Sequence, residues 1–382
     1  MNIFEESVAL HEKFHGKIGL VGKVPIENKH DLSLAYTPGV AEVCRVIARE
    51  PMRARDLTLK ANTIAVISDG SAVLGLGNLG ALGAIPVMEG KALLFKKFAG
   101  LDAFPICLDT QDTEEIIRTV KLLAPVFGGI NLEDIAAPKC FEIERRLQAE
   151  LDIPVIHDDQ HGTAVVVLAA LINALRVRGG ADVTKIKIVV SGAGAAGTAI
   201  TDLLLFFGVR NIIVCDSRGV LSGSRTDLNE EKSTLAARTN SKNFSGSLAD
   251  ALRGADVFVG VSAPNIVTAE MVRSMAPRPI VFAMANPDPE ILPDLARAAG
   301  AFIVATGRSD FPNQINNALV FPGMFRGALG NGVRHVTNEM FVRAAKNLAA
   351  CVVEPSPEAI IPSIFDESVV HAVANAICYE PV

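Results

Sequence analysis

The sequence is poor in large aromatic side chains: it has no tryptophan, and its only tyrosines are Tyr36 and Tyr379. It also has no stripe of basic residues with interleaved aromatics, the pattern typical of nucleic-acid-binding proteins, and its formal net charge is -6. Nucleic acid is therefore not an expected partner.

Paired cysteines and targeting segments are missing as well. The six cysteines form no CxxC pair, and most lie in apolar runs, which predicts buried free thiols in a reducing compartment. Residues 1–17 lack the apolar core of a signal peptide. The longest nearly continuous apolar stretch, 164–175, is too short to span a bilayer. We expect a cytoplasmic protein without a membrane partner.

The 382 residues, 49% of them hydrophobic, are enough for two domains. Residues 1–160 mix short strands and helices with glycine-rich and acidic segments, which indicates an α/β domain. Residues 161–382 alternate strands with helices up to about Phe321, the pattern of a Rossmann-type, doubly wound parallel sheet. The stretch 163–175 is predicted to be a helix joining the domains. The helical segment after Phe321 is a candidate to fold back on the first domain.

A glycine-rich turn near the start of the second domain predicts a dinucleotide site. Residues 191–197 read SGAGAAG, a GxGxxG pattern between a β-branched run and a predicted helix. Gly192 permits the tight turn, Gly194 lets a pyrophosphate approach the backbone, and Gly197 lets helix and strand pack closely. The helix N-terminus offers free N–H groups to the phosphates. The expected site also includes Thr163, Ala195, Ala196 and Thr198.

The next predicted strand ends at Asp216, where a carboxylate accepts hydrogen bonds from the adenosine ribose and repels a 2′-phosphate. This position favours NAD as the cofactor. Ser217 and Arg218 follow directly, and an arginine there can meet a phosphate, so NADP stays open as an alternative.

Two pairs of adjacent carboxylates follow apolar runs: Glu133 with Asp134, and Asp158 with Asp159. Neighbours on an ideal strand point to opposite faces, so both members of a pair reach one ion only from a turn or a strand end. Three or four of these carboxylates are therefore expected to converge on one cation.

Carboxylate oxygens suit Mg²⁺ or Mn²⁺, whereas a Zn²⁺ site would need more soft ligands than His157 and His161 supply. Helix capping is the alternative for Asp159, which stands four residues before Thr163. Gly162 and Thr163 are predicted to form the turn and cap that start the helix into the second domain.

Long stretches of the sequence resemble the malic enzyme family in its short bacterial form. The matching segments extend from about residue 11 to beyond residue 330 and include AYTPGVAEVC, DGSAVLGLGNLGALGAIPVMEGKALLFKKFAG, GINLEDIAAPKCFEIE, HDDQHGT, SGAGAAG, ANPDPE and GRSDFPNQINNALVFPGMFRGAL. The family oxidatively decarboxylates L-malate to pyruvate and CO₂ with NAD or NADP and a divalent metal. The resemblance implies this reaction, oxaloacetate decarboxylation and a homodimer.

The resemblance also implies the site residues. Tyr36 of the YTPG motif matches the general acid and Lys91 of the EGK motif the general base, with Asp158 beside the lysine. Asn286 of ANP and Asn317 of QINN would lie near nicotinamide and substrate. The metal ligands would be Glu133, Asp134 and Asp159.

These roles fit the chemistry. Lys91 must be neutral to accept the C2 hydroxyl proton of malate; burial and a nearby cation lower its pKa, while Asp158 opposes this. After hydride transfer and loss of CO₂, Tyr36 protonates C3, directly or with Lys91 returning the proton.

Two questions stay open at this point. Larger animal members carry a substrate-holding arginine just before the LGLG stretch, where this sequence has Ser71 and Ala72, so the group that binds the substrate carboxylates is unassigned.

The alternative functions are another metal-dependent, NAD(P)-linked 2-hydroxyacid dehydrogenase, an enzyme that mainly decarboxylates oxaloacetate, and a non-catalytic nucleotide-sensing module. The sensing module would need neither the acidic pairs nor Tyr36 and Lys91.

Overall fold

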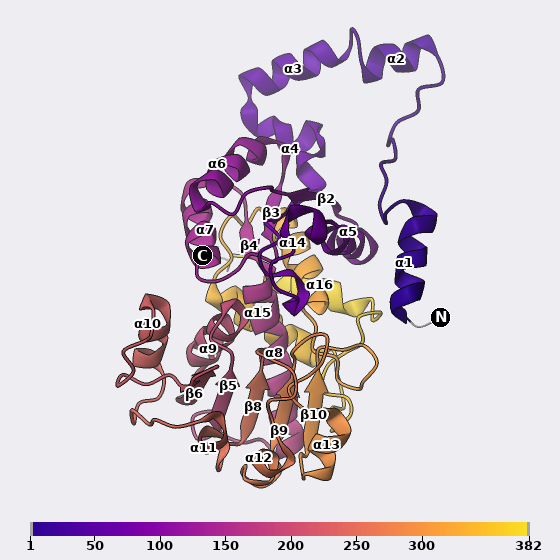
Figure 1. Cartoon of the computed structure of the whole chain (residues 1–382). Coiled ribbons are helices and arrows are strands. Elements are labelled where there is room, and N and C mark those ends of the chain that lie inside the picture. The colour runs from indigo at the N-terminus through magenta and orange to yellow at the C-terminus, as the bar shows by residue number, and fades with distance from the viewer. Residues whose placement is uncertain (1–2, 380–382) are drawn as a thin grey trace.

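A computed structural model describes residues 3–379, in which two separate β-sheets are joined by a long helix (Figure 1). The first sheet has the order β2-β1-β3-β4 and is wholly parallel. The second has the order β10-β9-β8-β5-β6-β7 and is parallel except for its edge strand β7. The predicted α/β architecture is confirmed, with one antiparallel edge strand that the sequence did not indicate.

The first sheet lies between two helical layers, because its strands alternate apolar side chains between two faces. Ile64 and Val66 pack toward α5, while Ala65 and Ile67 pack toward α6 and α7. The elements are β1 (Thr63–Ser68), α5 (Gly80–Ala99), β2 (Asp102–Cys107), α6 (Thr113–Leu123), β3 (Gly129–Leu132), α7 (Lys139–Glu150) and β4 (Val155–His157).

The second sheet also lies between two helical layers. Ile188 and Val190 face α8 and α9, whereas Val189 and Phe258 face the layer of α11, α12 and α13. Its elements are β5 (Lys187–Ser191), α9 (Ala195–Phe207), β6 (Asn211–Asp216), β7 (Gly219–Val220), α10 (Glu230–Arg238), α11 (Leu248–Leu252), β8 (Val257–Gly260), α12 (Ala269–Arg273), β9 (Ile280–Ala283), α13 (Pro293–Ala298) and β10 (Ile303–Thr306).

The joining helix α8 (Asp158–Arg178) begins directly after β4, with His157 as its N-cap. The predictions of a polar turn after β4 and of a helix start at Gly162 and Thr163 are therefore wrong. Asp158 instead occupies the first turn, where the free N–H groups and the helix dipole favour negative charge.

By length and composition α8 could cross a membrane, which corrects the expectation of a stretch too short to do so. However, 72% of its apolar window is buried inside the protein. Within it, the Asn173 side chain donates hydrogen bonds to the carbonyls of Ala349 and Ile360. These contacts identify α8 as a core helix.

The chain after the second sheet forms α14 (Phe321–Gly330), α15 (Asn338–Ala350) and α16 (Ser368–Ala376). Phe321 meets Phe95 of α5 edge-on, with 4.7 Å between ring centroids. The C-terminal helices thus pack against the layer that covers the first sheet. Short 3₁₀ helices lie at η1 (Pro51–Arg53), η2 (Leu59–Asn62), η3 (Val73–Gly75), η4 (Ala124–Val126) and η5 (Asn317–Leu319).

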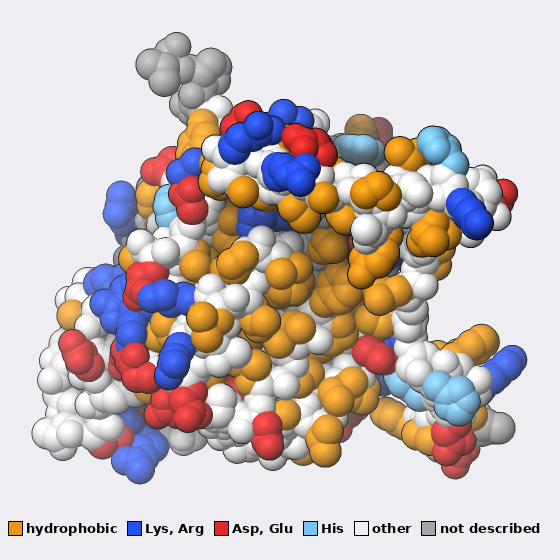
Figure 2. Space-filling view, turned by 90° about the horizontal axis from the view of Figure 1, so that it is seen from above, with side chains coloured by type: hydrophobic (Ala, Val, Ile, Leu, Met, Phe, Trp, Pro, Cys, Tyr) orange, Lys and Arg blue, Asp and Glu red, His pale blue; other side chains and the backbone are white. Residues whose placement is uncertain are grey.

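The N-terminal segment differs from the rest of the chain. None of the residues described in its four helices is buried, and Figure 1 shows α2 and α3 arching away from the sheets. Figure 2, which looks down on this end, shows hydrophobic side chains gathered on the surface. The helices are α1 (Ile3–Phe14), α2 (Lys29–Ala35), α3 (Val40–Arg49) and α4 (Ala54–Leu57).

The six cysteines are all free, as predicted, but their expected burial is only partly correct. Cys140 and Cys215 are buried, Cys44 is exposed, and the other three are of intermediate exposure. Cys44 is exposed because α3, on which it lies, has no buried face.

Candidate active site

Three of the predicted carboxylates meet at the carboxyl edge of the first sheet. Glu133 and Asp134 follow β3, and Asp159 lies in the first turn of α8 after the neighbouring strand β4. One oxygen of each lies within 4.8 Å of the other two. Asp134 has a positive φ of 53°, so Glu133 and Asp134 do not point to opposite faces as neighbours on a strand do. Two neighbouring residues must depart from strand geometry in this way to bind the same ion.

Lys91 reaches the same point from α5. Its Nζ lies 2.9 Å from a Glu133 oxygen and 2.5 Å from an Asp158 oxygen. It also donates a hydrogen bond of 3.3 Å to the Asn317 side chain and lies over the Phe321 ring. The structure therefore brings Lys91, Asp158 and Asn317 together with the carboxylate group.

Burial and mutual repulsion raise the pKa of Glu133, and they raise that of Asp134 to about 7. Burial also acts to lower the pKa of Lys91, but Asp158, Glu133 and Asp159 together outweigh it and raise this pKa. The predicted opposite effects of burial and of Asp158 on this pKa are thus confirmed, and without a cation the carboxylates outweigh burial. All three pKa shifts reflect an excess of buried negative charge.

A hard divalent cation fits this donor set. All donors are oxygens, and one buried carboxylate oxygen of Asp134 has no hydrogen-bond partner among the described residues. The two histidines lie outside the group: His161 pairs with Glu144, and His157 is fully buried. A zinc site at HDDQHGT is not supported.

Glu144 is a residue that the sequence reasoning missed. Its buried carboxylate accepts hydrogen bonds from the His157 backbone N–H (2.8 Å) and the Gln160 side chain (3.1 Å), and it pairs with His161. It thereby anchors the start of α8. The available signal was a charge on the apolar face of α7, one position after buried Ile143.

Gly162 of the same motif has a steric role. A Cβ atom there would lie 1.8 Å from an Asp158 carboxylate oxygen. Glycine therefore leaves room for the Asp158 carboxylate to fold over the first turns of α8 and reach Lys91.

The cluster opens into a cavity of about 620 Å³ between the two sheets. Among the predicted residues, Thr163, Ala196, Asn286 and Asn317 line it together with Lys91 and the three carboxylates. Tyr36 is not among the lining residues and is 66% exposed at the end of α2. Residues from the N-terminal segment that the sequence reasoning missed also line the cavity: Ser7, His11 and Lys17.

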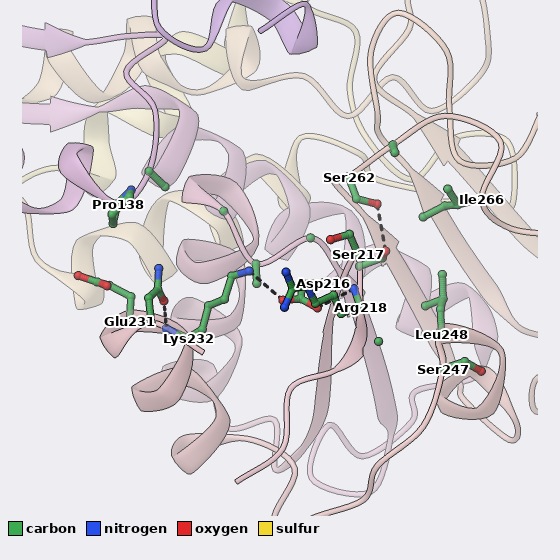
Figure 3. A pocket seen from close by; sticks show the side chains of 18 of the residues that line it. Pro138, Asp216, Ser217, Arg218, Glu231, Lys232, Ser247, Leu248, Ser262 and Ile266 are labelled. Atoms are coloured by element: carbon green, nitrogen blue, oxygen red, sulfur yellow. Dashed lines mark hydrogen bonds and ion pairs between the residues drawn. The ribbon is translucent and has the colours of Figure 1, made fainter. Parts of the chain in front are cut away.

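A second cavity of about 780 Å³ surrounds the glycine-rich turn (Figure 3). Gly192 has a φ of 116°, and a Cβ on Gly197 would lie 1.8 Å from the Gly192 carbonyl oxygen. Gly194 is the N-cap of α9, so Ala195 and Thr198 lie in its first turn. The turn has the open backbone that a pyrophosphate needs.

The Asp216 carboxylate, which also lines this cavity, is paired with cations. The Arg225 guanidinium donates hydrogen bonds of 2.7 and 3.2 Å, and Lys232 donates one of 2.8 Å. Burial raises the pKa of Asp216, but these bonds overcome it and lower the pKa to about 2. Asp216 therefore stays ionised. The Arg218 side chain pairs with Asp227 instead.

Two family models match almost the whole chain. Residues 15–148 match the malic enzyme N-terminal domain, and residues 160–380 match the malic enzyme NAD binding domain.

Relatives and solved structures agree with these matches. The bifunctional malic/malolactic enzyme of Bacillus subtilis is 54% identical over 99% of this chain and 92% of its own length. The NAD-dependent malic enzyme of Geobacillus stearothermophilus is 56% identical over 99% of this chain and 78% of its length. The crystal structure of the Thermotoga maritima NAD-dependent malic enzyme superposes with a TM-score of 0.94 at 51% identity, covering 99% of both chains.

The NADP-dependent malic enzyme of Escherichia coli is 46% identical over 95% of this chain, which spans half of that protein. Relatives named for NAD and relatives named for NADP are thus both similar to this chain over nearly its whole length. The chain belongs to the malic enzyme family and is an NAD(P)-dependent malate oxidoreductase that decarboxylates its substrate.

Proposed function

We propose that Lys91 is the proton-transfer group of this enzyme and that Glu133, Asp134 and Asp159 hold its divalent metal. The observation that carries the proposal is the convergence of these side chains, since Lys91 Nζ lies 2.9 Å from a carboxylate of the metal group. Asp158 bonds to the same amine and fixes its position.

We assign each of these groups a separate role in the reaction. A bound Mg²⁺ or Mn²⁺ supplies positive charge to the substrate oxygens that become negative during the reaction. A bound cation would offset the carboxylate charge that raises the pKa of Lys91, which would favour the neutral amine that can accept the hydroxyl proton of malate. Asn317, which contacts Lys91, and Asn286, which lines the same cavity, would orient substrate and nicotinamide.

The test is a coupled assay of the purified protein. L-Malate, Mn²⁺ and NAD or NADP are mixed, the reduced cofactor is followed by absorbance, and pyruvate is measured separately, with and without a chelator. We expect one pyruvate for each reduced cofactor, and no turnover with chelator present. Cofactor reduction without pyruvate would instead identify a simple 2-hydroxyacid dehydrogenase.

For the cofactor, we propose a preference for NAD. The support is an ionised Asp216 in the cavity wall, whose charge opposes a 2′-phosphate. Lys232 and Arg225 reduce this repulsion, so NADP should be used less well rather than excluded. The ratio of kcat/KM for the two cofactors measures the preference directly.

We further propose that the enzyme is a homodimer in which Tyr36 serves the site of the other subunit as general acid. Within one chain Tyr36 stands outside the cavity, on helices without a buried residue. The segment around it exposes apolar side chains that a second copy would cover, namely Leu20, Val21, Val24, Ile26 and Leu34. Light scattering should give twice the 40.4 kDa of one chain; a monomeric mass would contradict the proposal.

Two further proposals concern the domain boundaries and the location in the cell. We propose domains of residues 1–160 and 161–382, supported by family matches that end at residue 148 and begin at residue 160. We also propose a cytoplasmic location, which six free cysteines support.

A further inference from the structure

The substrate cavity contains a cation that the proposed mechanism does not use. Malate carries two carboxylates, and the proposed metal site accounts for only one of them. Among the described residues that line the cavity, the only lysines are Lys91 and Lys17, and no arginine is present. Lys91 is already paired with Glu133 and Asp158. Lys17 is therefore the free cation for the second carboxylate.

Lys17 is fixed against the helix that carries Lys91. Its backbone N–H donates a 3.1 Å hydrogen bond to the Glu89 carboxylate, and its Nζ donates one of 2.5 Å to the Pro86 carbonyl. Pro86 precedes Lys91 by five residues, roughly 7.5 Å along the axis of α5. Lys17 and Lys91 thus both line the cavity, and Pro86, which Lys17 contacts, lies about 1.4 helical turns from Lys91 on α5.

The ammonium group of Lys17 has capacity left for a ligand. Among the described residues it donates one hydrogen bond, to an uncharged carbonyl, although an ammonium group has three donors. Burial lowers the pKa of Lys17, and Glu89 only partly offsets this. A carboxylate arriving in the cavity would restore the solvation that burial removes.

Neighbouring polar groups are less suitable. His11 also lines the cavity, but its Nδ1 donates to the Ser7 carbonyl, so its ring offers a ligand only the single position Nε2. The Ser71 hydroxyl is occupied, since it donates to Asp69 and accepts from the Ala136 N–H. The loop at Ser71 and Ala72 therefore offers the substrate no cation.

We propose that Lys17 binds the carboxylate of malate that is not held at the metal site and so selects dicarboxylic over monocarboxylic 2-hydroxy acids. This inference rests on the proposed function, because it assigns one carboxylate and the hydroxyl of the substrate to the metal group. It also gives the N-terminal segment a task at the active site of its own chain.

The first test compares Lys17→Gln with Lys17→Arg. We expect the glutamine variant to raise KM for malate by roughly tenfold to a hundredfold, the range for a lost charge-assisted hydrogen bond, with kcat changed by less than about threefold. KM for NAD and the half-saturating Mn²⁺ concentration should not change. The arginine variant should restore most of the affinity. Lys23→Gln is the matched control, since Lys23 is exposed and pairs with Asp102.

The second test measures binding by calorimetry in the presence of Mn²⁺. Oxalate can place both carboxylates on the metal, whereas tartronate, which chelates through its hydroxyl and one carboxylate, keeps the other carboxylate free. Lys17→Gln should weaken tartronate by the same factor as malate and change oxalate by less than about twofold. Equal losses for both inhibitors, or no loss for tartronate, would overturn the role of Lys17.

The proposed metal site and the role of Lys17 can be contradicted separately. If wild-type protein with Mn²⁺ binds neither oxalate nor tartronate, the proposed metal site is wrong and this inference falls with it. If oxalate binds normally and the Lys17→Gln change leaves the affinities for malate and tartronate unchanged, only the role of Lys17 is contradicted and the proposed metal site is not.

Discussion

The N-terminal segment and the joining helix represent opposite ways of placing a functional group. The helices from α1 to α4 have no buried residue, yet they carry Tyr36. Helix α8 is largely buried and holds Asp158 and Asp159 in its first turn. The proposed metal ligands and Lys91 are thus brought together within one chain, whereas Tyr36 lies on an exposed segment.

Substitutions in the two regions should therefore have different effects on activity. Changes at the preformed cluster should act on metal and proton transfer within each subunit. Changes at Tyr36 should leave metal binding intact and remove a group that we propose arrives from the partner. The predictions below test whether the two regions are independent in this way.

The largest effect is expected for Lys91→Ala. Removal of the base should lower kcat by roughly a thousandfold or more, because proton transfer from the substrate hydroxyl loses its acceptor. Steady-state kinetics measures this, and circular dichroism should show an unchanged fold. Lys97→Ala, at an exposed position on the same helix, is the control. Near-normal turnover of Lys91→Ala would contradict the assignment.

Tyr36→Phe comes next, with a fall in kcat of roughly a hundredfold to a thousandfold, since C3 of the enolate loses its proton donor. The Mn²⁺ requirement should stay at the wild-type level, as expected for a group remote from the cluster. Tyr379→Phe removes the only other tyrosine hydroxyl, which accepts a hydrogen bond from the Arg334 N–H, and should be close to neutral. A large change in the Mn²⁺ requirement of Tyr36→Phe would break the comparison.

Asp159→Ala should raise the half-saturating Mn²⁺ concentration by roughly tenfold to a hundredfold, because one of three carboxylate ligands is lost. At saturating Mn²⁺ part of the activity should return. The measurement is a Mn²⁺ titration of the initial rate. An unchanged requirement would remove Asp159 from the ligand set.

A smaller effect is expected at the cofactor cavity. Asp216→Ala removes the charge that opposes a 2′-phosphate and releases Lys232 and Arg225 to meet one. The ratio of kcat/KM for NADP to that for NAD should rise by roughly tenfold. A ratio that stays constant would show that Asp216 does not set the preference.

The smallest effect concerns stability. Because the pKa of Asp134 is raised to about 7 in the folded chain without metal, its contribution to stability is present at low pH and is lost as pH rises from about 4 to 7. Mn²⁺ replaces the bound proton, so it should raise Tm by a few degrees more at pH 8 than at pH 6. Thermal unfolding with and without Mn²⁺ checks this; an equal gain at both pH values would speak against a protonated ligand group.

Most of the local structure could be predicted from the sequence. The apolar runs predicted as strands form β1, β5 and β6, most of whose residues are buried, and the glycine pattern forms the expected turn. The acidic pairs could be interpreted because each follows a strand of a parallel sheet, whose carboxyl ends share one edge. Local periodicity and turn chemistry decide such features.

The rest depends on contacts between distant segments. The helix start at Asp158 was missed because its support comes from Glu144 on α7. Arg225 and Lys232 could not be assigned to Asp216 from their spacing, and the position of Lys17 is fixed by α5, 69 residues away. The YTPG motif predicts a role for Tyr36, but no pattern in one chain tells which subunit it would serve.

A heterodimer of Tyr36→Phe and Lys91→Ala subunits tests the central claim most directly. The two chains carry different affinity tags, so that the mixed dimer can be purified and its malate turnover compared with the wild type. If Tyr36 serves the partner, one site per mixed dimer keeps both groups, and the dimer should show about half of wild-type activity. If Tyr36 serves its own chain, every site lacks one group, and the mixed dimer would be as inactive as either parent.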